Sequence, residues 1–194
     1  VDYQSEKYAA RFRSVIATVQ RAEQLLDQDD QFTRAVVIHL HKLMAYKDEY
    51  EVARLLLDDA ATSGYQAVGG ANTKVTYHLH PPMLRSLGLG RKLELRRSAP
   101  PALAALRASK RVRGTLADPF RWAAVRKLER AMIPEYIEAV ERLCQRLSAE
   151  TIAEAVSIAS LPDQVRGYES LKVTRATAYR GELADRMRAW SAAR

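Results

Sequence analysis

The sequence is poor in the residues that bind metal cofactors and form cross-links. Its 194 residues include a single cysteine, Cys144, so no disulfide can form within the chain. No Cys-x-x-Cys pair is present to hold zinc or an iron–sulfur cluster. Because free thiols are typical of a reducing compartment, and because Cys144 lies in a helical pattern, we expect a buried cysteine in a cytoplasmic protein.

Long apolar runs are also absent. The sequence has no stretch of about 18 apolar residues, the length from which a membrane-spanning helix is inferred. Val1 is not followed by an apolar leader, so we expect neither secretion nor a membrane partner, and this start is typical of a chain cut from a longer one. The chain is 47% hydrophobic, which is enough to bury the core of one domain.

No complete catalytic motif is present. There is no Gly-x-Ser-x-Gly elbow, and Gly69-Gly70-Ala71-Asn72 precedes a strand pattern instead of opening a helix, which predicts a turn and not a phosphate loop. His39 and His41 diverge if they lie on a helix, which disfavours them as metal ligands. His78 and His80 share a face if they lie on a strand, but no third ligand has suitable spacing. We therefore favour polar strand residues over a metal site and expect no metal ligand and no catalytic residue in this chain.

Apolar spacing predicts a mainly α-helical chain with long antiparallel helix hairpins. Apolar residues recur every three or four positions from Tyr3 to Leu26 and again from Val36 to Leu57. Two long helices joined by a few residues normally pack antiparallel, so residues 3–58 are expected to form a helical hairpin. Asp29-Asp30 supplies the carboxylates expected to cap the second helix.

The middle of the chain changes pattern. Residues 65–97 contain two runs that alternate with period two, Lys74–His80 and Lys92–Arg96, which indicate a small antiparallel β-ribbon or sheet. Helices are expected again over residues 100–192, with one start at Asp118-Pro119. The whole chain is interpreted as a single, mostly helical domain, residues 1–194, with a β insertion.

Five charged residues lie between Ala45 and Arg54, inside an otherwise apolar helical pattern. Two of them, Lys47 and Arg54, fall on the apolar stripe, and charges that face a core must be paired or must face a partner. We predict a paired, largely buried cluster where the second helix meets the terminal elements, with a docking surface for another domain as the alternative. The residues are Lys47, Asp48, Glu51 and Arg54, and Arg166 can join either arrangement.

Positive charge is concentrated in one segment. The net charge of the chain is +8, and the segment from Arg85 to Arg130 contains 13 basic and 3 acidic residues. Such a field attracts nucleic acid, an acidic protein or a phosphorylated ligand, and a solvated basic face remains the alternative. Nucleic acid is disfavoured because Phe120 and Trp122 are the only aromatic residues in this segment that could stack on bases. The interaction candidates are Arg96, Arg97, Arg111 and Arg113.

Four segments of the chain together resemble a known family. They are Lys42–Arg54, His78-Leu79-x-Pro81-Pro82, Arg113-Gly114-Thr115 with Asp118-Pro119-Phe120, and Leu161–Tyr168. In this order they resemble the C-terminal domain of the long, fused indolepyruvate ferredoxin oxidoreductases, and the resemblance spans roughly Tyr3 to Lys172. After Tyr168 the family usually continues with Gly-His-Val-Lys, whereas this chain has Glu169-Ser170-Leu171-Lys172, so no role tied to that histidine is expected here.

The resemblance implies a parent enzyme that oxidatively decarboxylates aryl-2-oxoacids such as indolepyruvate to the aryl-acetyl-CoA. Such enzymes use thiamine diphosphate and iron–sulfur clusters and pass electrons to ferredoxin. Family members bind thiamine diphosphate through a Gly-Asp-Gly motif that this chain lacks, so the resemblance implies a non-catalytic domain without a cofactor of its own. Its expected partners are other domains or subunits of the parent enzyme, with ferredoxin or CoA as candidates for the basic segment. The alternative is an autonomous basic module that binds nucleic acid or an acidic protein.

Overall fold

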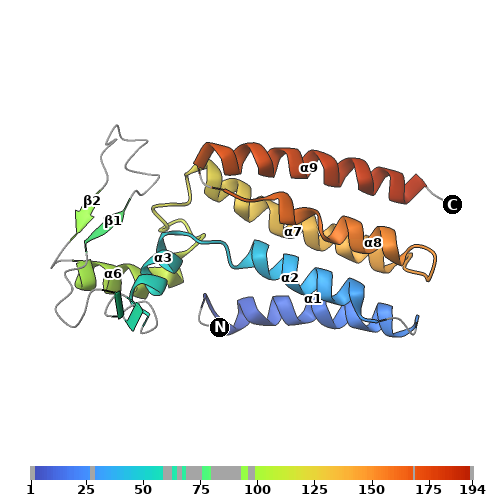
Figure 1. Cartoon of the computed structure of the whole chain (residues 1–194), viewed down its shortest axis with the longest axis horizontal. Helices are drawn as coiled ribbons and strands as arrows, with labels where there is room; N and C mark the ends of the chain where they lie inside the picture. Colours follow the sequence, from blue (N-terminus) through green and yellow to red (C-terminus); the bar gives the residue numbers. More distant parts are fainter. Residues whose placement is uncertain are drawn as a thin grey trace. The chain divides into compact units, whose positions relative to one another are not determined.

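The computed structural model describes residues 3–26, 29–58, 63–64, 67–68, 76–79, 93–95, 99–167 and 169–192 (Figure 1). The described residues are mainly α-helical, which confirms that part of the predicted fold class. The chain divides into two compact units. We call Ser5–Tyr46 with Lys127–Arg194 the helical unit, and Asp2–Gln4 with Lys47–Arg126 the polar unit. Arg96 and Arg97 lie outside the described residues.

The helical unit is a set of helices packed side by side. Its elements are α1 (Glu6–Gln24), α2 (Gln31–Met44), α7 (Ala124–Cys144, from Lys127 onward), α8 (Ile152–Ala159), the 3-10 helix η2 (Leu161–Gln164) and α9 (Glu169–Ala192). Helices α1 and α2 run antiparallel, because the Tyr8 hydroxyl donates to the Met44 carbonyl at 2.9 Å while Glu23, at the other end of α1, binds the start of α2. Figure 1 shows this pair in two shades of blue.

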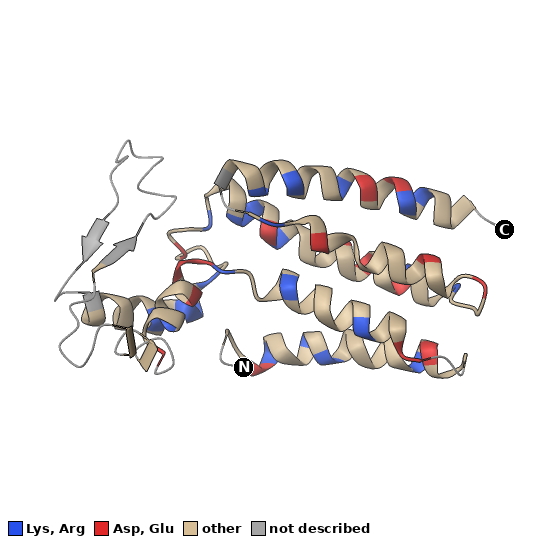
Figure 2. Ribbon diagram, in the orientation of Figure 1, with Lys and Arg blue, Asp and Glu red and all other residues tan. Residues whose placement is uncertain are grey.

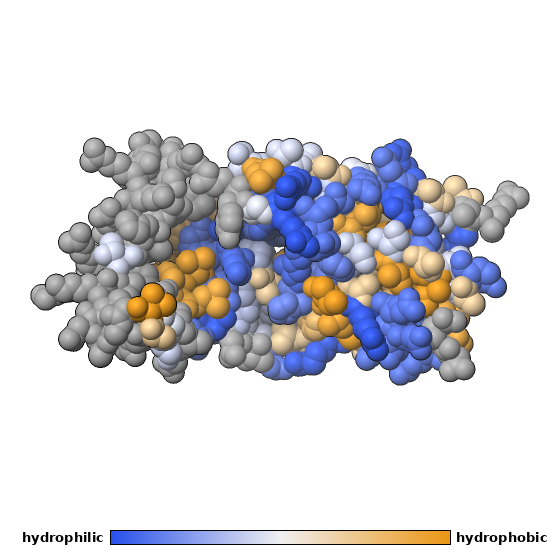
Figure 3. Space-filling view, viewed as in Figure 1, coloured by the Kyte–Doolittle hydropathy of each residue, from blue (hydrophilic) through white to orange (hydrophobic). Residues whose placement is uncertain are grey.

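Helices α7 and α9 run parallel. Contacts between them occur in the same order along both helices: Glu129 with Lys172, Glu135 with Arg180, and Arg142 with Ser191. Helix α8 lies next to α7, where the Tyr136 hydroxyl donates to the Ala159 carbonyl at 2.8 Å. Polar side chains therefore join these helices both at the surface and, at Glu129 and Tyr136, in the interior. Hydrophilic atoms alternate with smaller apolar patches on the face drawn in Figure 3.

One apolar core holds the helical unit together. The predicted three-and-four spacing of α1 and α2 places one stripe of each helix in this core, as expected for amphipathic helices. Helices α7, α8 and α9 contribute the rest. Its fully or almost fully buried members include Val19, Phe32, Val36, Leu40, Tyr136, Leu143, Ile158 and Tyr179.

A buried carboxylate begins α2 in place of the expected cap. Asp30 stands at the cap position of α2 in a left-handed conformation (φ 50°), and its side chain makes no capping hydrogen bond. Instead, the Glu23 carboxylate, which is 0% exposed, accepts the backbone N–H groups of Phe32 and Thr33 at 2.8 and 2.7 Å. These N–H groups have no partner within the helix, so a carboxylate from α1 can satisfy them as well as a local cap.

The single second helix expected up to Leu57 is instead two helices. Helix α2 ends at Met44, and α3 (Glu49–Leu56) begins five residues later. The Asp48 carboxylate accepts the backbone N–H of Glu51 at 2.9 Å, so Asp48 caps the start of α3. Glu49 and Glu51 add negative charge to the first turn, where the helix dipole favours it. A new helix start at Asp48 is thus more stable than continuation of α2.

The apolar cluster that the structure describes in the polar unit is small. Ala53 and Leu103 are buried there, with Leu56, Leu57 and Leu106 partly buried around them. Its other elements are α6 (Ala99–Ala108), the 3-10 helix η1 (Ser109–Val112) and strands β1 (Tyr77–Leu79) and β2 (Leu93–Leu95). The two strands pair antiparallel, with Tyr77 opposite Leu95 and Leu79 opposite Leu93. None of the helices that the structure describes, in either unit, has the length and hydropathy of a membrane span.

Candidate functional site

Asp48 and Arg113 form a buried ion pair in the polar unit. Each side chain is 3% exposed. The Arg113 Nε and Nη2 groups donate to the two Asp48 carboxylate oxygens at 2.5 and 2.9 Å, the two-point geometry for which a guanidinium is suited. Nη1 donates to the Tyr3 carbonyl at 2.6 Å, and the Tyr3 ring centroid lies 3.9 Å from the guanidinium carbon. The charges are therefore paired and hydrogen-bonded, as burial requires.

A second buried carboxylate, Asp118, organises the turn after Arg113. Asp118 is 3% exposed and accepts the Tyr50 hydroxyl at 3.0 Å and the backbone N–H groups of Gly114 and Phe120 at 2.7 and 3.0 Å. Gly114 has φ 75°, a backbone conformation that favours glycine. Burial, together with the bond to Asp118, raises the pKa of Tyr50 well above its usual value, so its hydroxyl remains a donor.

The helix start predicted at Asp118-Pro119 is wrong. Residues 119–122 form turns, and α7 begins at Ala124. Asp118 does have the side chain of a helix cap, but its oxygens bind Tyr50, Gly114 and Phe120 and so stabilise a turn. The edge of the Phe120 ring packs on Tyr50 with the ring centroids 5.4 Å apart, which adds an apolar contact to the same turn.

Two more ion pairs extend from α3. The Glu51 carboxylate accepts Arg54 Nε and Nη2 at 2.9 and 2.7 Å, with side chains 11% and 26% exposed. The Glu49 carboxylate accepts two N–H groups of Arg126, each at 3.2 Å, with both side chains about one-tenth exposed. Burial raises the pKa of Glu49, and the positive charge of Arg126 opposes that rise.

The predicted charged cluster is correct for three residues and wrong for one. Asp48, Glu51 and Arg54 are buried or half-buried and paired, whereas Lys47 is exposed. The reason is the helix break: because α2 ends at Met44, the stripe that was expected to carry Lys47 inward does not continue through it.

The partners of the cluster also differ from the prediction. Asp48, Tyr50 and Glu49 bind side chains from residues 113–126, not from the terminal elements. Sequence reasoning missed Glu49, Tyr50, Asp118 and Arg126. The signal that could have found the first three was their position inside the two segments singled out for the family resemblance, Lys42–Arg54 and Arg113–Phe120.

The basic segment is only partly available at the surface. Arg113, expected in an exposed basic face, is buried against Asp48, and Arg126 is buried against Glu49. Arg107 and Arg111 are exposed, at the end of α6 and in η1, where Figure 2 shows blue basic positions. In the described part of this segment, some arginines are therefore buried in ion pairs and others are exposed at the surface.

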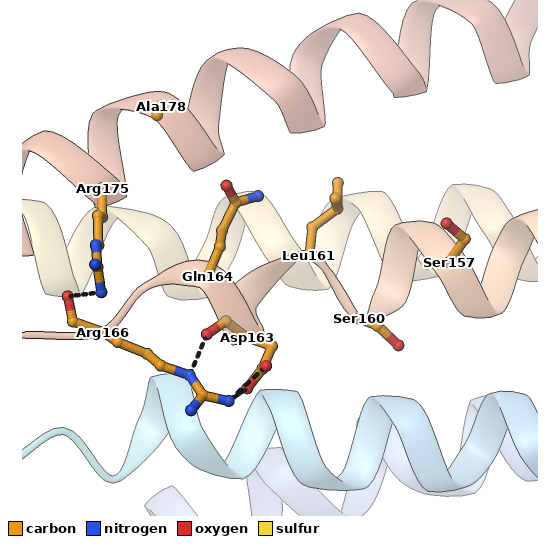
Figure 4. Close-up of a pocket in the computed structure, with 8 residues that line it drawn as sticks. All are labelled: Ser157, Ser160, Leu161, Asp163, Gln164, Arg166, Arg175 and Ala178. Carbon is orange, nitrogen blue, oxygen red and sulfur yellow. Dashed lines mark hydrogen bonds and ion pairs between the residues drawn. The ribbon is translucent and has the colours of Figure 1, made fainter.

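Arg166 belongs to a separate arrangement in the helical unit. Its side chain is 64% exposed and donates to both Asp163 carboxylate oxygens, at 2.6 and 2.7 Å, which lowers the pKa of that carboxyl. Lys42 Nζ donates to the carbonyls of Pro162 and Asp163, both at 2.9 Å, and so attaches η2 to α2. An open groove of about 610 Å³ lies beside this joint, with Arg166, Arg175 and Gln164 in its lining (Figure 4).

The residues of this chain do not fit the iron–sulfur clusters implied for the parent enzyme. Such clusters need several thiolates. Cys144 is the only cysteine, and burial, with a smaller effect of Glu141, raises the pKa of its thiol to about 11, which keeps it protonated. Among the described residues no group of three or more His, Cys, Asp or Glu side chains is placed to hold a metal ion, and His80 lies outside them.

These features define a class: a mainly α-helical protein in which an apolar helical unit accompanies a unit built on buried ion pairs. The sequence model of the family of unknown function DUF6537 matches residues 1–185, so the chain belongs to that family. Comparison with curated proteins found no match. Comparison with solved structures found none either.

Proposed function

We propose that this chain is a non-catalytic C-terminal accessory domain of a thiamine diphosphate-dependent, aryl-2-oxoacid (indolepyruvate) ferredoxin oxidoreductase, and that it docks on the catalytic domains of that enzyme. The observation that carries the proposal is that three of the four segments with the family resemblance are joined to one another by polar contacts. Two pairs of segments contribute, one pair in each unit.

In the polar unit, the first segment binds the third: Asp48 binds Arg113, and Tyr50 binds Asp118. In the helical unit, Lys42 of the first segment binds the carbonyls of Pro162 and Asp163 in the fourth. Residues that serve a common fold are expected to contact one another in this way, whereas isolated motif matches have no reason to do so. The contacts therefore support the view that the resemblance reflects a shared domain.

The chemistry of the buried groups supports an accessory role. Asp48 is bound by a guanidinium, and Asp118 accepts three N–H or O–H donors. A general acid or base must reach a proton of its substrate and titrate near the working pH. The Asp48 and Asp118 carboxylates are buried and hydrogen-bonded to groups of the same unit, and the pKa of the neighbouring Tyr50 is raised. Such groups are suited to stabilising the unit and not to exchanging protons with a substrate.

The test is to express the whole gene product and measure its mass and its activity. We expect a much longer protein that reduces a low-potential dye when supplied with indolepyruvate, CoA and thiamine diphosphate. Removal of residues 1–194 should abolish or strongly reduce this rate. A gene product of about this length, or a long one that oxidises no 2-oxoacid under these conditions, rejects the proposal.

The second candidate function is an autonomous basic module, favoured by the exposed Arg107 and Arg111. If nucleic acid is its partner, the affinity for random DNA must fall steeply as salt rises, because each neutralised phosphate releases counterions. Affinity that changes little between about 50 and about 200 mM salt excludes nucleic acid as the partner.

A further inference from the structure

We infer that the turn from Gly114 to Ala123 in the polar unit, here called the docking turn, is a preformed binding site for an acidic amphipathic segment of another protein. Leu116 and Trp122 would enter the apolar face of that segment, and the neighbouring basic residues would pair with its carboxylates.

The first observation is exposure. Leu116 is 86% exposed and Trp122 is 66% exposed, and they lie six residues apart in the same turn. Single exposed apolar side chains are common on protein surfaces and need no explanation. Here a leucine and a tryptophan of the same ten-residue segment are both exposed. Tryptophan is also among the residues that most often dominate binding energy in interfaces.

The second observation is that hydrogen bonds fix the conformation of the docking turn. Asp118 accepts the N–H groups of Gly114 and Phe120 as well as the Tyr50 hydroxyl. The Thr115 hydroxyl donates to the Val112 carbonyl at 2.7 Å and accepts the Ala117 N–H at 3.2 Å. A turn fixed in this way loses little conformational freedom when a partner binds, so more of the contact energy appears as affinity.

The third observation is the sign of the surrounding charge. The one acidic residue of the docking turn, Asp118, is buried, whereas Arg107 at the end of α6 and Arg111 in η1 are exposed. Among the described residues, the exposed charged side chains that shortly precede the docking turn in the sequence are therefore positive. A partner with carboxylates around an apolar stripe complements both features, and such complementarity raises association rates and excludes wrong partners.

Geometry favours a protein segment over the other occupants. The Arg121 guanidinium carbon lies 4.8 Å from the Trp122 ring centroid, so a cation covers one face of the indole and a nucleobase could stack only on the other face. Leu116 has no ring with which to stack. A second copy of the chain would bring the same positive side chains together, and like charges oppose that contact.

The docking turn adds a specific binding site to the docking role proposed above. It rests on the proposed function only in naming the larger protein to which the chain belongs. The test therefore uses the 194-residue chain itself. The probe is a fluorescein-labelled synthetic helix of about 20 residues, with Leu and Phe on one face and Glu on its flanks. A second probe has every Glu replaced by Gln, and binding is followed by fluorescence anisotropy.

We expect saturable binding of the Glu peptide that weakens as salt rises, and binding of the Gln peptide at least about tenfold weaker. Leu116→Ser and Trp122→Ser should each weaken binding of the Glu peptide at least about tenfold, as expected for central anchors. Leu25→Ser is the matched control, because Leu25 is also 86% exposed but belongs to the helical unit, and it should leave binding unchanged. Circular dichroism of the variants checks that they remain folded.

The inference is overturned if the Glu peptide does not bind, if the Gln peptide binds equally well, or if Leu25→Ser weakens binding as much as Leu116→Ser. It is also overturned if a single-stranded oligonucleotide displaces the peptide and binds more tightly, or if sedimentation shows that the docking turn mediates a dimer. Peptide binding by a chain whose whole gene product has no oxidoreductase activity rejects the proposed function alone. Activity without peptide binding rejects the docking turn alone.

Discussion

The helical unit and the polar unit are stabilised by different kinds of contact. In the helical unit, side chains from five helices form one apolar core, and its fully buried Glu23 serves as a helix cap. Among the described residues of the polar unit, Ala53 and Leu103 form a small buried apolar cluster, while the ionisable residues Asp48, Arg113 and Asp118 are also buried. Apolar burial is non-directional, whereas a buried charge depends on one particular partner. The polar unit should therefore be much more sensitive to the loss of a single group.

The largest effect is expected from Arg113→Met. This change leaves the Asp48 carboxylate buried without its cation, which should lower the free energy of unfolding by about 3–5 kcal/mol. Arg111→Met, two residues away and exposed, is the control and should change it by less than about 0.5 kcal/mol. Urea denaturation followed by circular dichroism measures both. Equal stability of the two variants would show that the ion pair does not stabilise the polar unit.

A second change in the same pair sharpens this test. Asp48→Asn keeps an oxygen that can cap α3 but removes the charge. Combined with Arg113→Met, it should recover part of the lost stability, because no unpaired charge then remains buried. A double variant less stable than Arg113→Met alone would contradict this account.

A core truncation should cost somewhat less in the helical unit. Leu40 is 0% exposed, and Leu40→Ala should lower the free energy of unfolding by about 3 kcal/mol through lost apolar burial and the cavity that remains. Ile38, on the same helix and 60% exposed, provides the control Ile38→Ala, with an expected change below about 0.5 kcal/mol. The loss caused by Leu40→Ala should not depend on salt. A strong salt dependence of this loss would mean that apolar burial does not distinguish the helical unit from the polar unit.

Glu51→Ala should have a smaller effect of about 1 kcal/mol. Its partner Arg54 is 26% exposed and also lies 3.7 Å from Asp58, so its charge stays solvated and has another carboxylate nearby when Glu51 is removed. The measurement is again urea denaturation, compared with Arg113→Met. A loss of about 3 kcal/mol or more would mean that Arg54 depends on Glu51 as strongly as Asp48 depends on Arg113.

The smallest effect concerns pH and the helical unit. Burial lowers the pKa of His39 below its ordinary value of 6.5, while Asp163 opposes this shift and Lys42 adds to it. Since the unfolded chain then binds a proton more readily than the folded chain, stability is full above about pH 6.5 and is lost as the pH falls through 6.5 toward the folded pKa. His39→Gln should lose less stability than the parent between about pH 7.5 and about pH 5.5. Parallel losses in the two proteins would exclude His39 as the cause.

The sequence alone determined the mainly helical class and the apolar faces of α1 and α2, because helical periodicity is a local property of neighbouring residues. It also predicted a paired cluster of Lys47, Asp48, Glu51 and Arg54 because Lys47 and Arg54 fall on an apolar stripe, and three of these four residues are paired in the structure. The family resemblance drew attention to the segments that contain Asp48, Tyr50, Arg113 and Asp118 but not to the contacts between these residues.

Only the tertiary structure decided where the helices begin and which charges meet. A capping carboxylate can be recognised in a sequence, but the backbone N–H group that it accepts depends on which segments fold against it. Glu23 caps α2 in place of Asp30, and Asp118 stabilises a turn where a helix start was expected. Asp48 and Arg113 are 65 residues apart in the sequence, and no local pattern reports a contact over such a distance, because it forms only when the chain between them has folded.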